Sequence, residues 1–341
     1  MKKVFVSGAG GYIGVPLCEQ LLKSNYDVIA FDRYFFGHDV LGHLSNEKFR
    51  SIVGDIRDIE PGLLEGVDAV IDLAGLSNDA SAEIDVSLTQ SINNAGGRHL
   101  ASVAKAAGVR RYIYSSSASV YGHGAKSHLT ETDPCHPQTE YARSKLAIET
   151  ALKELQGADF ETVILRNATV FGLARRMRFD LAVNIMTLRA WRDRVIYIMG
   201  GGEQWRPFIH VRDVVRAMQL ALESPASIVS GEIFNVGSDS LNYQIKNLSQ
   251  FVQDVIPNVT IHVIPDNPDL RDYHLSFEKI KRVLKFDDCI QVHEGIVEIK
   301  QALERGVIRG DDPRFYTLQW YSSIMEWEKR IKELSLKGRI F

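Results

Sequence analysis

Hydrophobic and polar positions change their spacing several times within the first 32 residues. Residues 3–7 form a short apolar run that leads into the glycines of the stretch VFVSGAGGYIG. After Gly14 the apolar positions recur at helical spacing, and they are Val15, Leu17, Cys18, Leu21 and Leu22. A second apolar run, DVIAFD, ends at Asp32. The pattern predicts a buried strand, a tight glycine turn, a helix and a second strand, in the order that a dinucleotide-binding fold requires.

The alternation of strand-like and helix-like segments continues to about residue 172. Strand-like runs cover residues 49–53, 69–73, 112–116 and 162–166, and helix-like runs cover residues 84–107 and 140–155. This alternation favours an α/β fold, in which a doubly wound parallel sheet carries helices on both faces. Several strand-like runs end in small or polar residues, as in GDIRD, DLAG and YSSSAS. Ligands of open α/β sheets bind beyond the carboxyl ends of the strands, so these endings predict one shared crevice.

The pattern loosens after Gly172, where we expect a second, smaller lobe. Helix-like and strand-like stretches and a glycine-rich loop follow one another at residues 177–192, 195–199, 200–208 and 211–222. We therefore divide the chain into residues 1–172, a dinucleotide-binding domain, and residues 173–341, mainly a substrate-binding lobe. Parts of residues 205–240 could return to the first domain, because chains of this kind can cross back. The tail from Asp312 onward predicts a terminal helix that docks through an aromatic face, with a partner-binding helix as the alternative.

The composition is that of an ordinary globular protein. The chain has 341 residues, 45% of them hydrophobic, and a formal net charge of −3. Without basic blocks, this charge argues against a nucleic-acid binder. No apolar run approaches the roughly 18 residues of a membrane span, and the N-terminus enters a strand at once, so we expect no membrane association and a cytoplasmic protein. Cys18, Cys135 and Cys289 are odd in number and far apart, which indicates reduced, structural thiols and no metal site.

The glycine turn has the chemistry of a pyrophosphate site. Gly8 and Gly11 can adopt backbone angles that other residues avoid and bring bare backbone close to phosphates, while Gly14 allows the helix to pack on the strand. The N-terminus of that helix then offers free N–H groups and partial positive charge to the phosphates. Asp32 lies 18 residues after Gly14, where its carboxylate would bind an adenosine ribose and repel a 2′-phosphate. This favours NAD over NADP, although Arg33 could soften the preference, and a glycine-rich loop without a ligand is the alternative.

Tyr141 and Lys145 lie four residues apart in a helix-like segment, so both side chains share one helix face. A phenol has an ordinary pKa of about 10 and becomes a useful base only where a nearby cation favours the phenolate. Lys145 can supply that charge. Ser117 ends a strand-like run, where its hydroxyl could hold a substrate proton toward Tyr141. The alternative is that Tyr141 and Lys145 are an ordinary pair on the protein surface, and that Ser117 only ends or caps a secondary-structure element.

The motifs GAGGYIG, SSSASVYG, YARSK and FIHVRDV, together with Asp32 and in chain order, resemble the extended short-chain dehydrogenase/reductase family. Within it the chain resembles the nucleotide-sugar epimerases and dehydratases. The resemblance covers nearly the whole chain, with the tail after about residue 311 least matched. It implies a Rossmann-type doubly wound parallel sheet with a smaller C-terminal substrate-binding lobe, NAD as the cofactor and a nucleotide-diphosphate sugar as the substrate.

The resemblance also implies roles for single residues. Ser117 matches the catalytic serine or threonine, Tyr141 the base, and Lys145 the residue that binds the nicotinamide ribose. Arg206 and Arg271 match arginines that clamp the substrate's pyrophosphate, as a guanidinium fork suits, although each could instead form a surface ion pair. The residues that the resemblance places along the cofactor are Gly8, Gly11, Tyr12, Ile13, Gly14, Asp32, Arg33, Asp55, Ile56, Leu73, Ala74, Gly75, Asn93, Ser115, Tyr141 and Lys145.

Two departures from the family pattern bear on the reaction. The 4,6-dehydratases carry an Asp-Glu pair directly after the catalytic serine or threonine, and this chain has Ala118 and Ser119 there, which makes dehydration improbable. Where the family commonly has a substrate-binding asparagine the chain has Thr169, and Asn167 could compensate or be structural.

We therefore expect an NAD-dependent enzyme that oxidises the C4 hydroxyl of a nucleotide-diphosphate sugar, hexose or heptose, as a 4-epimerase or a 4-dehydrogenase. The alternative from another class is a catalytically idle NAD-binding sensor or scaffold, and a 4,6-dehydratase is less favoured. The resemblance also implies a homodimer in which the helix-like segments 84–107 and 140–155 pair with their copies.

Overall fold

Seven parallel strands form the central sheet of this computed structural model, which describes residues 2–122, 128–265, 272–336 and 338–340. The strands lie in the order β10-β6-β5-β4-β1-β2-β3. Their bounds are β1 Lys3–Ser7, β2 Asp27–Asp32, β3 Phe49–Val53, β4 Ala69–Asp72, β5 Arg111–Ser117, β6 Glu161–Asn167 and β10 Ile233–Val236. The order reverses direction beside β1, as a doubly wound sheet requires, so the predicted fold class is confirmed.

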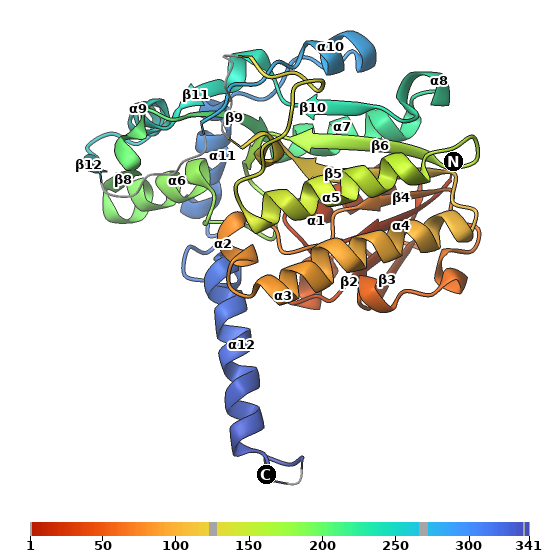
Figure 1. The fold of residues 1–341 in the computed structure, drawn as a ribbon. Coiled ribbons are helices and arrows are strands. Elements are labelled where there is room, and N and C mark those ends of the chain that lie inside the picture. Colours follow the sequence, from red (N-terminus) through yellow and green to blue (C-terminus); the bar gives the residue numbers. More distant parts are fainter. Residues whose placement is uncertain (1, 123–127, 266–271, 337, 341) are drawn as a thin grey trace.

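Helices cover both faces of this sheet (Figure 1). The alternation along β1 shows why, because Val4 and Val6 belong to one buried cluster and Phe5 to another. The first cluster includes residues of α1 (Gly14–Lys23) and α7 (Val211–Glu223), and the second includes residues of α4 (Gly97–Ala106) and α5 (Glu140–Leu155). The carboxyl ends of the strands stay open between these helix layers.

Two further small sheets lie outside the central sheet. One has the order β11-β9-β7 and the other pairs β12 with β8. Their bounds are β7 Thr169–Phe171, β8 Val195–Met199, β9 Trp205–His210, β11 Asn242–Gln244 and β12 Thr260–Ile264. The remaining helices are α2 Asp79–Ala82, α3 Val86–Thr89, α6 Ala182–Asp193, α8 Ala226–Val229, α9 Ile245–Val255, α10 Glu278–Leu284, α11 Val292–Glu304 and α12 Thr317–Leu334.

Three details differ from the sequence-based expectation. The helix expected over 177–192 begins only at Ala182, because residues 177–181 are irregular and include a turn at residues 179–180. The helix expected over 84–107 begins at Val86 and contains a π-helical segment, Gln90–Gly96. Strand β10, which could have joined either lobe, pairs with β6 of the central sheet. The division of the chain at residue 172 stays a prediction.

The last helix, α12, extends away from the body of the molecule (Figure 1). Only its first turns are covered by other parts of the chain, and Thr317 is its only fully buried residue. Farther along, Trp327, Ile331 and Leu334 are 50%, 48% and 70% exposed. No helix within the described residues has both the length and the apolar character needed to cross a membrane.

Candidate active site

A cavity of about 260 Å³ opens at the carboxyl ends of β1, β2, β4, β5 and β6. The glycine turn after β1 and the serines at the end of β5 line it, together with α5, the segment after β7 and one residue of α12. The strand endings that the sequence singled out therefore do meet in one crevice.

The glycine turn is a close-fitting cradle of bare backbone. Gly8 has a φ of +70°, and a Cβ there would lie 2.7 Å from the carbonyl carbon of Leu73. A Cβ on Gly14 would lie 2.3 Å from the carbonyl oxygen of Gly8, so only glycine lets α1 begin this close to β1. No side chain caps the N-terminus of α1. The N–H of Val15 donates to the carbonyl of Gly11 at 3.2 Å, but no hydrogen bond within the described residues uses the N–H groups of Ile13 and Gly14. These two N–H groups remain available to an anionic group, which fits the pyrophosphate of a dinucleotide.

Asp32 lines the cavity at the end of β2. Its Oδ1 accepts a hydrogen bond of 2.6 Å from the N–H of Tyr34, and its Oδ2 accepts one of 2.9 Å from the N–H of Gly10. Burial raises the pKa of this carboxyl, and the two N–H groups oppose the rise. Arg33 lies 3.5 Å from Asp55 as an ion pair, so its charge is shared with that carboxylate. The carboxylate at Asp32 is thus fixed in place, as recognition of an NAD ribose requires.

Asp55 and Asn93, both expected along the cofactor, form hydrogen bonds with neighbouring residues of the chain. The Asp55 carboxylate accepts hydrogen bonds of 2.9 and 2.6 Å from the guanidinium of Arg57, which lowers its pKa. Asn93 is buried and does not line the cavity. Its Oδ1 accepts from the N–H of Leu76 at 2.8 Å and its Nδ2 donates to the carbonyl of Leu76 at 3.1 Å. Asn93 therefore fixes the backbone beside Gly75, which does line the cavity.

Tyr141 and Lys145 both face the cavity from α5. The Lys145 ammonium lies 5.7 Å from the centre of the Tyr141 ring and 4.8 Å from that of Tyr114. It donates a 2.7 Å hydrogen bond to the carbonyl of Ser115. Burial lowers the Lys145 pKa to about 8, while Asp72 opposes this change. At neutral pH the ammonium is therefore still mostly charged.

Tyr141 is half-buried, and burial of its phenol raises its pKa to about 12, with a further increase from Asp79. Two neighbours lower this pKa: the guanidinium of Arg178 and a hydrogen bond with Ser117. The cation with the largest such effect is Arg178 and not Lys145, which the sequence spacing had suggested. With a pKa of about 12 the phenol is protonated at neutral pH, so additional positive charge is needed before it can act as a base.

Arg178 is a cavity residue that sequence reasoning missed. It is buried and forms an ion pair with Asp180, with an Nη2 to Oδ2 distance of 2.6 Å. Asn78 donates a 2.6 Å hydrogen bond to the same carboxylate oxygen. A lone arginine in an irregular segment carries no motif, and the segment 177–181 was expected to be helical.

The serines at the end of β5 have different partners. Ser117 accepts a 2.9 Å hydrogen bond from the hydroxyl of Ser119, and Ser116 donates one of 2.5 Å to the buried Glu149. Asn167 donates to Ser115 Oγ at 2.9 Å, while its buried Oδ1 has no hydrogen-bond partner in the described part of the chain. Because Asn167 lines the cavity, that oxygen is an acceptor available to a ligand.

The other residues predicted to bind the substrate, Thr169, Arg206 and Arg271, do not all line the cavity. Thr169 lines the cavity. Arg206 does not, and it is buried with its guanidinium 5.1 Å from the ring centre of Tyr273, which does line the cavity. Arg271 lies outside the described residues. The other cavity residues that the sequence did not single out include Phe35, Phe36, Arg176 and Tyr321.

Comparisons with known proteins agree with this arrangement. Residues 4–237 match the model of a family described as the NAD dependent epimerase/dehydratase family. The chain is 27% identical over 309 residues to UDP-glucuronic acid decarboxylase 2 of Arabidopsis thaliana, covering 86% of this chain but only 66% of that protein. It is 30% identical over 303 residues to dTDP-D-glucose 4,6-dehydratase of Homo sapiens, covering 82% of this chain and 83% of that protein.

A solved structure of MoeE5 in complex with UDP-glucuronic acid and NAD has the same fold. It superposes with a TM-score of 0.76 at 26% identity, over 89% of this chain and 99% of that one.

Proposed function

The chain belongs to the NAD-dependent epimerase/dehydratase family, and within it we propose that it oxidises the C4 hydroxyl of a nucleotide-diphosphate sugar and returns the hydride, as a 4-epimerase. NAD is the cofactor of this family, and the glycine cradle, the uncapped start of α1 and the fixed Asp32 carboxylate fit it. The observation that carries the proposal is the grouping of Ser117, Tyr141 and Lys145 on one wall of the same cavity.

In this proposal Tyr141 takes the proton of the C4 hydroxyl. Ser117 orients that hydroxyl, because it lines the same cavity and acts on the phenol, whose pKa it lowers. Arg178 lowers the pKa of the phenol, and Lys145 adds positive charge and binds the nicotinamide ribose. NAD, when bound, supplies the chemistry of accepting the C4 hydride, which leaves a 4-keto sugar. Return of the hydride to the opposite face of C4, with the proton returned by Tyr141, gives the epimer.

Elimination of water is disfavoured by the residues next to Ser117. Ala118 and Ser119 are both buried in a short turn, Ala118–Tyr121, and neither side chain is an acid or a base at neutral pH. A 4,6-dehydration needs such groups to remove the C5 proton and to protonate the leaving hydroxyl. The similarity to a human dehydratase therefore supports the shared oxidation step rather than the elimination.

The substrate class rests on relatives whose names include UDP-sugars and dTDP-glucose, and on a MoeE5 structure that holds UDP-glucuronic acid and NAD. We propose that Asn167 and Thr169 contact the sugar, and that Arg206 and Arg271 bind the pyrophosphate. Arg206 would reach it after a movement of Tyr273, whose ring it faces.

We further propose a cytoplasmic homodimer in which α4 and α5, already in contact within one chain, pair with their copies. Analytical ultracentrifugation at micromolar concentration tests this, and a sedimentation mass equal to the monomer would count against it.

The experiment that tests the function is incubation of the NAD-loaded protein with a panel of UDP- and dTDP-sugars, including glucose, galactose, glucuronate and heptose derivatives. The proposal predicts a C4 epimer from one of them without net reduction of the cofactor. Accumulation of reduced cofactor with a ketone would indicate a dehydrogenase, and a pentose would indicate decarboxylation. Tight NAD binding with no product from any sugar would favour an idle sensor.

A further inference from the structure

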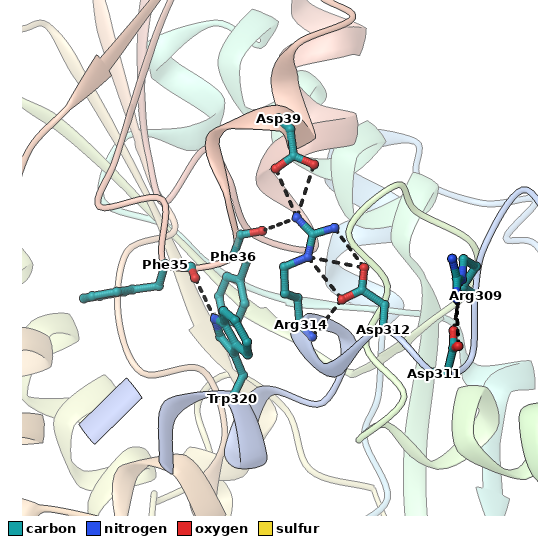
Figure 2. A network of polar contacts seen from close by, with 8 residues as sticks. All are labelled: Phe35, Phe36, Asp39, Arg309, Asp311, Asp312, Arg314 and Trp320. Carbon is teal, nitrogen blue, oxygen red and sulfur yellow. Dashed lines mark hydrogen bonds and ion pairs between the residues drawn. The ribbon is translucent and has the colours of Figure 1, made fainter. Parts of the chain in front are cut away.

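The segment that begins at residue 312 forms hydrogen bonds and an ion pair with the loop after β2, at residues 35–39. The guanidinium of Arg314 donates a 3.0 Å hydrogen bond to Asp39 Oδ1 and one of 3.4 Å to the carbonyl of Phe36. The indole of Trp320 donates a 2.6 Å hydrogen bond to the carbonyl of Phe35 (Figure 2). The residues that these bonds join lie 275 to 285 positions apart in the sequence. The loop after β2 follows Asp32 directly, so the C-terminal segment is held beside the adenosine end of the cofactor site.

Tyr321, one residue after Trp320, lines the cavity itself. Its ring makes an edge contact with Phe35 at 5.9 Å and a tilted contact with Phe36 at 5.4 Å between ring centres. Burial raises the pKa of its phenol to about 12, and the charges that act on it include Arg176 and Asp32. The hydroxyl makes no hydrogen bond with any residue that the structure describes, so a donor and acceptor is left over beside Asp32.

Arg176 closes the same part of the cavity from the second lobe. It is 2% exposed, its guanidinium lies 3.5 Å from the ring centre of Phe36, and it donates a 2.8 Å hydrogen bond to Thr317 Oγ1. Burial lowers its pKa to about 10, so it stays charged at neutral pH. Its Nε is buried without a hydrogen-bond partner in the described part of the chain. A buried donor without a partner costs free energy, so this arginine, which lines the cavity, is suited to bind a polar or anionic ligand.

We propose that Arg176 and Tyr321 are cofactor-binding residues, and that the segment 312–325 forms a cover over the adenosine half of NAD that keeps the cofactor bound between turnovers. Arg176 donates to the phosphates or ribose hydroxyls, and Tyr321 binds the ribose beside Asp32. Arg314 and Trp320 do not touch the cofactor but hold the cover shut. The inference rests on the proposed function only for the identity of the cofactor, which the family shows.

A retained cofactor suits the epimerase reaction in particular. An epimerase returns its hydride within each turnover and has no need to exchange NAD, whereas a dehydrogenase must release or reoxidise it. The cover therefore favours the hydride-returning fate of the keto sugar.

The test is the rate at which NAD leaves the purified protein, measured without any sugar. NAD-loaded protein is passed through gel filtration, and dissociation is followed by displacement with a labelled NAD. We expect Arg176→Met and Tyr321→Ala to speed dissociation about tenfold to a hundredfold, the loss that one or two hydrogen bonds to a charged group imply. Tyr321→Phe, which keeps the ring contacts, should show part of this effect if the hydroxyl binds the ribose. Arg314→Ala should speed dissociation severalfold, because its ion pair with Asp39 is partly exposed.

A matched control lies just before this segment. Arg309 pairs with Asp311 at the surface and is 76% exposed, and Figure 2 shows this pair apart from Phe35, Phe36 and Asp39. Arg309→Ala should leave NAD dissociation unchanged, and circular dichroism should confirm that all variants are folded. Unchanged dissociation in folded Arg176→Met, Tyr321→Ala and Arg314→Ala would overturn the inference. Because no sugar is present, a failed sugar panel would leave this result intact, and unchanged dissociation would leave the epimerase proposal intact.

Discussion

The floor and the roof of the cavity are built in different ways. The floor consists of the glycine turn, the strand ends and α5, with Gly8, Asp32, Ser117, Tyr141 and Lys145. All of these residues lie in short motifs within the first 145 positions. The roof consists of Phe36, Arg176, Arg178 and Tyr321, which come from three irregular or terminal segments. The floor offers backbone, hydroxyl and amine groups for chemistry, and the roof encloses them and adds positive charge. We expect variants of the floor to change the rate of the chemical step. We expect variants of the roof to change how long NAD stays bound and the pKa of Tyr141.

The largest effect is expected from Tyr141→Phe on the floor. The variant loses one oxygen and little volume, so NAD and sugar should still bind while turnover falls by roughly a hundredfold to ten-thousandfold, the usual loss of a general base. Steady-state rates and NAD titration check this together. Near-normal turnover would remove Tyr141 from the chemistry and Ser117 with it.

Next in size is Arg206→Leu in the second lobe. If its guanidinium binds the substrate pyrophosphate, nucleotide-sugar affinity should fall about tenfold to a hundredfold through the loss of a charge-assisted bond, with NAD binding unchanged. Isothermal titration with the nucleotide diphosphate alone isolates this contact. Equal affinity in the variant would assign Arg206 to packing against Tyr273 only.

Arg178→Met tests whether the roof reaches the chemistry. Arg178 lowers the pKa of Tyr141, so its removal should raise that pKa and move the alkaline rise of the rate to higher pH. A tenfold higher proton affinity of the phenol should slow the reaction near neutrality by about tenfold, because the phenolate fraction falls in proportion. Removal of Arg178 also leaves the partly buried Asp180 without the arginine it pairs with, so the control is the double variant Arg178→Met with Asp180→Asn.

The pH–rate profile and NAD affinity of Lys145→Met should be measured together with those of Arg178→Met, so that a floor residue and a roof residue are compared directly. The lysine variant should show the smaller displacement of the pH profile and the larger loss of NAD affinity, because we propose that the Lys145 ammonium binds the nicotinamide ribose. A larger displacement of the pH profile in Lys145→Met than in Arg178→Met would show that Lys145 is the main cation that lowers the pKa of Tyr141.

The smallest effect is expected at Asp32. Asp32→Asn keeps the shape and removes the charge, so the preference for NAD over NADP should fall severalfold to about tenfold, since repulsion of the 2′-phosphate is lost. Competition titrations of both cofactors measure it. A wild-type protein that binds both equally would mean that Arg33 outweighs Asp32, despite its ion pair with Asp55.

The sequence predicted the central sheet and the floor because both depend on local patterns. Apolar runs, helical spacing and glycine positions are set within about 30 residues, and the strand ends must meet at one edge once the sheet is parallel. The cradle at Gly8 and Gly14 and the gathering of Ser117 with Tyr141 followed from this alone.

The roof could not be predicted in the same way. Arg176 and Arg178 lie in or beside a stretch that was expected to be helical and is irregular, and Tyr321 reaches the cavity because α12 docks by its first turns. The aromatic pattern of the tail did suggest docking, but nothing in it specified the loop after β2 as the partner. The hydrogen bonds of Asn93 with the backbone of Leu76 and of Asp55 with Arg57 also carried no signal in the sequence. The cofactor contacts of these two residues stay predictions.

The most direct test of the account is a single turnover of NAD-loaded protein with the active nucleotide sugar, carrying deuterium at C4. The account predicts that deuterium appears on the bound cofactor in the quenched reaction and returns to C4 of the epimer. In Tyr141→Phe the cofactor should remain unlabelled although the sugar is bound. Formation of product by the wild-type protein with no deuterium on the cofactor at any time would contradict oxidation at C4 and the function built on it.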